Sequence, residues 1–96
     1  MDKILIERLS DEKRKALKIP DAPQNFSGWS VWECAPSSFD WRYSEAEEAF
    51  VYQGKVKVRT NNGEVEINSG DFVTFPKNLS CHWEVIATVK KVYRFK

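Results

Sequence analysis

This sequence predicts an all-β fold, a sandwich or barrel preceded by one short helix. After Gly28 the chain divides into short segments in which apolar and polar residues alternate, and Pro, Gly, Asn and Ser separate these segments. The segments are rich in Val, Ile and aromatic residues, which strands favour. With 96 residues, 42% of them apolar, the chain is long enough to bury one core, so we expect a single domain.

The first 28 residues are expected to form an N-terminal strand, a short helix and a loop, and residues 29–96 the barrel. Ser10 can cap the helix, because Asp11 and Glu12 follow it and basic residues come later, as the helix dipole favours. The helix should span at most two or three turns and end before Pro20. We interpret its basic residues as a solvated helix face.

Eight strands are expected in the barrel, at residues 29–35, 39–43, 47–53, 55–60, 64–68, 72–75, 81–86 and 89–95. The hairpin around Asn62-Gly63 is the best defined, since this pair suits a two-residue turn. With that turn, Val58 would face Ile67 and Arg59 would face Glu66. The basic stripe of this strand would then be neutralised across the hairpin, which argues against a nucleic-acid site.

The only histidine, His82, lies between a cysteine and a tryptophan. Alternation along this strand makes Cys81, Trp83 and Val85 one uniformly apolar set, and His82 and Glu84 belong to the other. We therefore expect Cys81 and Trp83 to point inward and His82 to point outward. A zinc or iron site needs several converging ligands, so the histidine is interpreted as a surface residue beside a carboxylate.

The strand AFVYQ carries apolar residues on both faces. Ala49 and Val51 should follow Glu47 inward, which leaves Phe50 and Tyr52 outside and in need of cover. That cover would come from residues 4–6 or from a second subunit, and on this basis we predict a homodimer.

Composition limits the partners and the compartment. The net charge is +1, so no electrostatic attraction to nucleic acid or an anionic membrane is expected. The chain has no apolar run long enough to span a membrane, and its start does not resemble a secretory signal. We therefore predict a cytoplasmic protein, in which Cys34 and Cys81 stay free thiols.

The order of motifs resembles a cupin. Glu47 and Gly54 match the second half of the first cupin motif, Gly70 and Pro76 match the second motif, and the histidine position of that motif falls on Cys81. The stretches WECAPSSFDWRYSEAEEAFVYQGKVKV and GDFVTFPKNLSCHWEVIATVKKVYRF are similar to small stand-alone cupins of the cupin-3 group, related to ureidoglycine aminohydrolases. The resemblance covers residues 32–95 and implies a double-stranded β-helix, a jelly-roll barrel.

The resemblance also raises the question of a metal. Metal-binding cupins hold their ion with two His and a Glu from the first motif and a His from the second. The first two positions fall here on Asp40 and Arg42, or on Trp41 and Tyr43 with the shorter spacing, so Glu47 alone of the four expected ligands is present. We expect no cofactor, with an atypical divalent metal site of Asp40, Glu47 and Cys81 left open.

The barrel mouth should therefore hold an aromatic pocket. Its expected ligand-binding residues are Asp40, Trp41, Arg42, Tyr43 and Trp83, and its candidate catalytic residues are Glu47 and Cys81. Rings offer contact area and a few polar groups fix orientation, which predicts binding of a small organic metabolite.

Three alternatives stay open. The rings could simply fill a small barrel. The protein could be a cupin enzyme for a ureide-like substrate, or an interaction protein acting through its outer aromatic face. An inward Glu47 would pair with Arg42 or Tyr43, or else serve in proton transfer.

Overall fold

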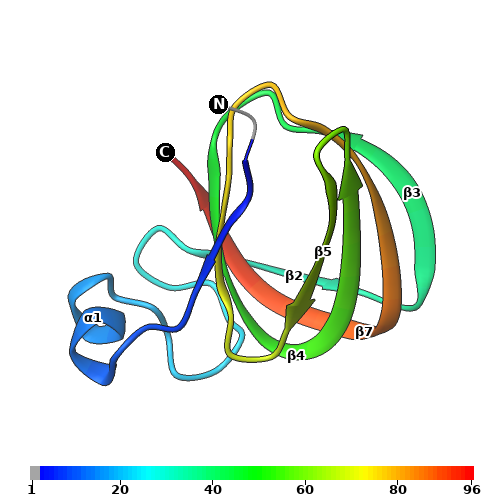
Figure 1. The fold of residues 1–96 in the computed structure, drawn as a ribbon. Coiled ribbons are helices and arrows are strands. Elements are labelled where there is room, and N and C mark those ends of the chain that lie inside the picture. Colours follow the sequence, from blue (N-terminus) through cyan, green and yellow to red (C-terminus); the bar gives the residue numbers. More distant parts are fainter. Residues whose placement is uncertain (1–2) are drawn as a thin grey trace.

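The chain folds, in the computed structural model, into antiparallel strands and one short helix, and the structure describes residues 3–96 (Figure 1). In chain order the elements are β1 (Leu5–Glu7), α1 (Asp11–Ala16), β2 (Ser30–Cys34), β3 (Ser37–Arg42), β4 (Glu47–Thr60), β5 (Gly63–Asn68), β6 (Phe72–Phe75) and β7 (Ser80–Phe95). No helix within residues 3–96 is both long and apolar enough to cross a bilayer.

Two long strands organise the sheet. β4 pairs with β5, β6 and β7, while β7 also pairs with β2 and β3, and every pairing is antiparallel. β1 pairs with β6 at one edge. Figure 1 shows β4 and β7 curving so that the sheet wraps around an interior. The side chains on this concave side form the larger of two apolar clusters.

β4 and β7 each join two of the predicted strands, so the expected barrel strands are present but their number is not eight. β4 runs through Gly54, where its pairing with β7 shifts register. Gly54 has a φ of 113°, and a Cβ there would lie 2.5 Å from the carbonyl oxygen of Thr88. Only glycine allows the two backbones to approach this closely. The bend at Gly54 lets one strand serve both halves of the barrel.

The hairpin of β4 and β5 corrects the predicted register by two residues. Thr60 pairs with Gly63, so the turn is Asn61-Asn62 followed by Gly63 at a φ of 119°. The hairpin therefore has a two-residue loop, Asn61-Asn62, instead of the predicted loop Asn62-Gly63. Because strand faces repeat every two residues, the slip leaves both faces intact.

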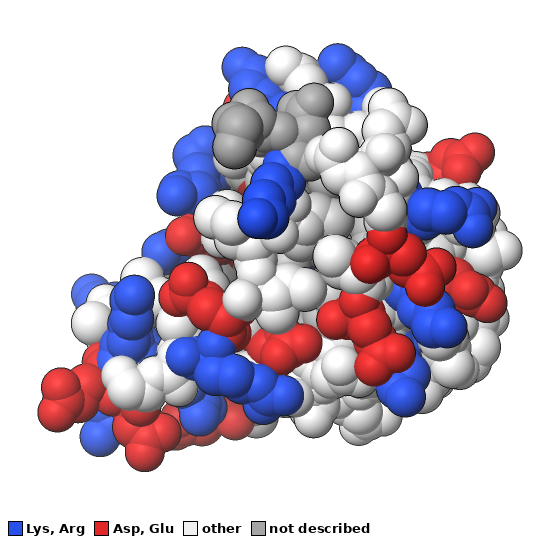
Figure 2. All heavy atoms as spheres, in the orientation of Figure 1, with Lys and Arg blue, Asp and Glu red and all other residues white. Residues whose placement is uncertain are grey.

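The faces of the hairpin keep their predicted character. Val58 now lies opposite Val65, and Arg59 lies opposite Glu64. Figure 2 shows Lys and Arg side chains interspersed with Asp and Glu over the visible surface. The basic stripe on β4 therefore faces acidic partners, as the sequence indicated.

The N-terminal helix begins where predicted and stays within the expected length. Ser10 accepts a hydrogen bond from the backbone N–H of Lys13 at 3.2 Å, as an N-cap residue does. The helix ends at Ala16, and Lys18 takes a left-handed φ of 59°. The chain therefore leaves the helix well before Pro20.

The outer side of β4 is covered within the chain itself. Phe50 is 5% exposed and belongs to a second apolar cluster with Ile19, Trp29, Phe72 and Val92. Residues after the helix, together with Trp29, supply the cover that we expected from residues 4–6 or from a second subunit. The expectation about the cover is wrong, because the loop after α1 folds back onto the sheet. Homodimer formation stays a prediction, but the face that suggested it is already buried.

Candidate functional site

The first half of β7 places its side chains as alternation predicted. Cys81, Trp83 and Val85 are buried, at 8%, 3% and 3% exposure, and Glu84 is exposed. His82 lies on the other face, where its Nδ1 is 2.8 Å from a carboxylate oxygen of Asp40. The histidine is thus an outer residue beside a carboxylate, in agreement with the prediction, although the partner is Asp40 rather than Glu84.

The same alternation along β3 separates residues that we expected to share a pocket. Asp40 and Arg42 face outward; the side chain of Asp40 is 92% exposed, and Arg42 donates a hydrogen bond to the amide oxygen of Asn78 at 3.1 Å. Trp41 and Tyr43 occupy the inward positions. The expected set is therefore corrected, since Asp40 and Arg42 do not line the aromatic pocket.

The pocket itself is a cavity of about 350 Å³ at the barrel mouth. Seven rings line it: Trp32, Phe39, Trp41, Tyr43, Trp83, Tyr93 and Phe95. Phe39 stacks on Trp83 with 6.0 Å between ring centroids, and Trp32 meets Trp83 edge-on at 5.8 Å. These contacts fix the ring of Trp83 from two sides. The rings therefore enclose a space instead of filling the barrel completely.

A buried ion pair forms the polar part of this pocket. Lys91 Nζ lies 3.0 Å from a carboxylate oxygen of Glu47, and the two side chains are 7% and 8% exposed. Four ring centroids surround the same nitrogen: Trp32 and Trp83 at 5.0 Å, Tyr93 at 5.6 Å and Phe75 at 5.8 Å. Glu47 is inward as predicted, but its partner is Lys91 and not Arg42 or Tyr43.

Burial sets the protonation behaviour of the groups around this pair. It lowers the pKa of Lys91, against the opposing attraction of the Glu47 carboxylate. It raises the pKa of Tyr43 far above the usual phenol value, and the negative charge of Glu47 adds to this effect. It also raises the pKa of the Cys81 thiol to about 11. Tyr43 and Cys81 are therefore neutral near pH 7.

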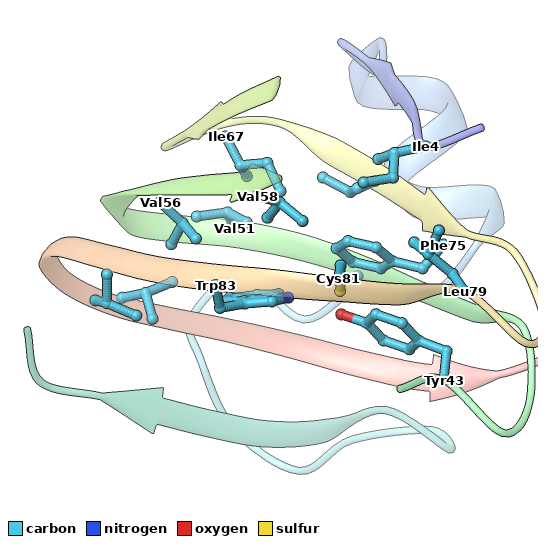
Figure 3. Close-up of a cluster of buried hydrophobic side chains, with 14 residues drawn as sticks. Ile4, Tyr43, Val51, Val56, Val58, Ile67, Phe75, Leu79, Cys81 and Trp83 are labelled. Carbon is cyan, nitrogen blue, oxygen red and sulfur yellow. The ribbon is translucent and has the colours of Figure 1, made fainter. Parts of the chain in front are cut away.

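The indole N–H of Trp83 lacks a hydrogen-bond partner within the described part of the chain, although it is fully buried. Figure 3 shows this nitrogen directed toward the region of Cys81 and the Tyr43 hydroxyl. The Cys81 thiol and the Tyr43 hydroxyl are therefore the polar groups that this N–H faces.

A second, more open hollow of about 600 Å³ lies beside the first. It is lined by Asp40, Trp41, Arg42, Arg59, Thr60, Asn61, Ser80 and Cys81. Trp41 borders both hollows, and Cys81 contributes to this one while its thiol faces the carbonyl oxygen of Trp41 at 3.6 Å. The two predicted catalytic residues thus line different hollows, with Glu47 in the aromatic pocket.

The residues present do not fit a divalent metal ion. Within residues 3–96 no three His, Cys, Asp or Glu side chains converge, and the Asp40 carboxylate is paired with His82 on the outer face. The Glu47 carboxylate is already paired with Lys91, so it is not free to act as a metal ligand. The open alternative of an Asp40, Glu47 and Cys81 metal site therefore has no geometric support.

Comparison with known families agrees with this barrel and its motifs. The sequence profile of the EutQ-like cupin domain, Cupin_3, matches residues 22–93, which is most of the chain. The chain belongs to the EutQ-like cupin family. The all-β jelly-roll fold expected from the sequence is thereby confirmed.

Solved structures give the same assignment for this EutQ-like cupin. A DUF861 family protein from Thermotoga maritima is 38% identical and superposes with a TM-score of 0.87, covering 98% of this chain and 100% of that one. The EutQ protein of Clostridium difficile is 22% identical with a TM-score of 0.62, covering 68% of this chain and 52% of the other. A EutQ protein from Salmonella typhimurium, 18% identical with a TM-score of 0.61, covers 94% and 66%. The last two likenesses concern the fold alone, and no curated protein matches the chain.

Sequence reasoning missed Lys91 in this EutQ-like cupin, although a signal was present. In the segment VKKVYRF, residues 89, 91 and 93 share one face of the strand. Val89 is fully buried and Tyr93 lines the pocket, so Lys91 between them must face inward as well. An inward lysine in the same barrel as an inward Glu47 would have predicted the pair.

Proposed function

We propose that this cupin binds a small, flat organic molecule in the aromatic pocket. The observation that carries the proposal is a cavity of about 350 Å³ walled by seven rings, with one buried ion pair as its polar group. Small-ligand sites have this composition, mostly apolar walls with a few polar groups that set orientation. The rings supply contact area, and the Lys91–Glu47 pair offers one donor and one acceptor side by side.

Titration of tryptophan fluorescence tests the proposal, because Trp32, Trp41 and Trp83 all line the cavity. A set of aromatic and heteroaromatic acids, amides and aldehydes is added to the protein, and a saturable change is expected for at least one class. Trp41→Ala should weaken binding without unfolding the protein, since this side chain is 53% exposed. Ile86→Ala, an exposed position on the outer face of β7, is the matched control. If no compound changes either the fluorescence or the melting temperature, the proposal is wrong.

Catalysis on a small nitrogen-containing, ureide-like compound is a second candidate. The observation that favours it is the Glu47 carboxylate, a possible acid or base enclosed with an amine in the same pocket. Ammonia release from small ureides such as allantoate is the assay, with Glu47→Gln as the test variant. An unchanged rate in this variant would remove Glu47 from the reaction.

Metal analysis of protein purified without chelator is expected to find less than one divalent ion per chain.

A further inference from the structure

Lys91 is placed where lysine is seldom found. Lysine is almost never fully buried unless it is paired, yet this side chain is 7% exposed inside the barrel. Its ammonium group meets one carboxylate and four ring faces. The nitrogen also borders the cavity, so a molecule held between the rings would lie against it.

Three features of this placement suit an amine that reacts with a carbonyl group. Glu47 lies 3.0 Å from Nζ and can accept a proton from it. Burial favours the neutral amine, because removal from water penalises the charged form. The ring walls exclude water, which protects a water-sensitive product. We propose that Lys91 is a nucleophile that condenses with a small aldehyde or ketone bound in the aromatic pocket.

Lys91 and Glu47 together supply every proton that the condensation requires. Lys91 gives one ammonium proton to Glu47, and its nitrogen lone pair forms a bond to the carbonyl carbon while the C=O π electrons move to oxygen. The oxygen takes the second nitrogen proton and becomes a hydroxyl group. Glu47 then returns its proton to that hydroxyl, the C–O bond breaks, and water leaves. The product is a protonated imine on Lys91, with Glu47 again a carboxylate.

The product fits the same surroundings as the reactant. A protonated imine carries the positive charge that the ammonium carried, so the Glu47 contact and the ring faces stabilise both. The pocket therefore holds the same charge before and after the reaction and needs no exchange of counter-ion. This inference rests on the proposed pocket, but it concerns a covalent activity that reversible binding does not require.

Reductive trapping on the wild-type protein tests the inference. Benzaldehyde or propanal is added with cyanoborohydride near pH 7, and each lysine is followed by peptide mapping and mass spectrometry. Lys91 should be labelled faster than the neighbouring Lys90, because burial lowers the pKa of Lys91 and so raises its fraction of neutral amine. Labelling of Lys91 at the rate of Lys90 or slower overturns the inference.

Two variants distinguish a specific reaction of Lys91 from labelling that reflects only the accessibility of its amine. Glu47→Gln should slow the labelling of Lys91, because the carboxylate that takes up the ammonium proton is lost, even though removal of its charge also favours the neutral amine. Lys90→Arg should leave it unchanged. Benzyl alcohol, which lacks the carbonyl group, is titrated by fluorescence in parallel. Fluorescence binding without Lys91 labelling overturns the covalent step alone, and absence of both also overturns the pocket.

Discussion

Removing the ammonium group of Lys91 while keeping its volume should destabilise the fold strongly. In Lys91→Met, the Glu47 carboxylate stays buried without a counter-ion. Two unit charges 3.0 Å apart attract by roughly 5 kcal/mol at an effective dielectric constant of about 20. Loss of one partner from a buried pair typically costs about 3–5 kcal/mol. We expect the free energy of unfolding to fall by about that amount at pH 7.

A double variant supplies the control for this prediction. Lys91→Met combined with Glu47→Leu removes both charges and leaves apolar side chains of similar size. Replacing a whole buried ion pair in this way is often neutral or stabilising, so the double variant should lie within about 1 kcal/mol of the wild type. The double variant should nevertheless fail to bind ligands that depend on a polar contact with Lys91 or Glu47. The double-mutant cycle then measures the interaction between the two side chains.

Urea unfolding followed by tryptophan fluorescence and circular dichroism measures both variants. We expect Lys91→Met to unfold at a lower urea concentration than either the wild type or the double variant. The single variant could instead match the wild type at pH 7, or the double variant could be no more stable than the single one. Either result would refute the interpretation of this pair as a closely coupled buried contact.

Four further predictions concern the rest of the molecule. Gly54→Ala should lower stability by about 3 kcal/mol, because the new methyl group meets the backbone of β7 at a positive φ; thermal unfolding measures it. Phe50→Asp should reduce stability by about 3 kcal/mol or more instead of dissociating an oligomer, and sedimentation combined with urea unfolding separates the two outcomes. The Cys81 thiol should react with a disulfide reagent more slowly than Cys34 at pH 8, and the difference should vanish in denaturant. Stability should fall as the pH rises above about 10, since unfolded phenols ionise there while burial raises the pKa of Tyr43 and keeps it protonated in the folded state. Tyr43→Phe should flatten that fall.

Alternation predicted the inside of the barrel well wherever the inward side chains are apolar. Cys81 and Trp83 follow this rule, and so does the outward direction of His82. Alternation is less informative about side-chain direction where a charged residue faces inward. Lys91 shares its face with Val89 and Tyr93, but Val92 on the other face is also buried, so alternation alone does not say which face is inward. Its direction follows only once the pairing of β7 with β4 is known.

The remaining differences arise from contacts that no short stretch of sequence contains. The observed Asn61-Asn62 turn and the predicted Asn62-Gly63 turn preserve the same faces, so the hydrophobic pattern cannot choose between them. The cover over Phe50 comes from Ile19 and Trp29, which precede it by more than twenty residues. Tertiary packing decides both outcomes, through the loop geometry and the position of the N-terminal segment.

The rings of this pocket serve two purposes that physical chemistry ties together. They wall a cavity for a flat molecule, and the faces of Trp32 and Trp83 also stabilise the positive charge of Lys91 at 5.0 Å. Burying an ammonium group is costly, and Glu47 together with these faces offsets that cost. A ring replaced by an aliphatic residue would therefore change both the shape of the pocket and the charge state of its amine. Ligand binding and the reactivity of Lys91 should consequently change together in ring variants such as Trp32→Leu.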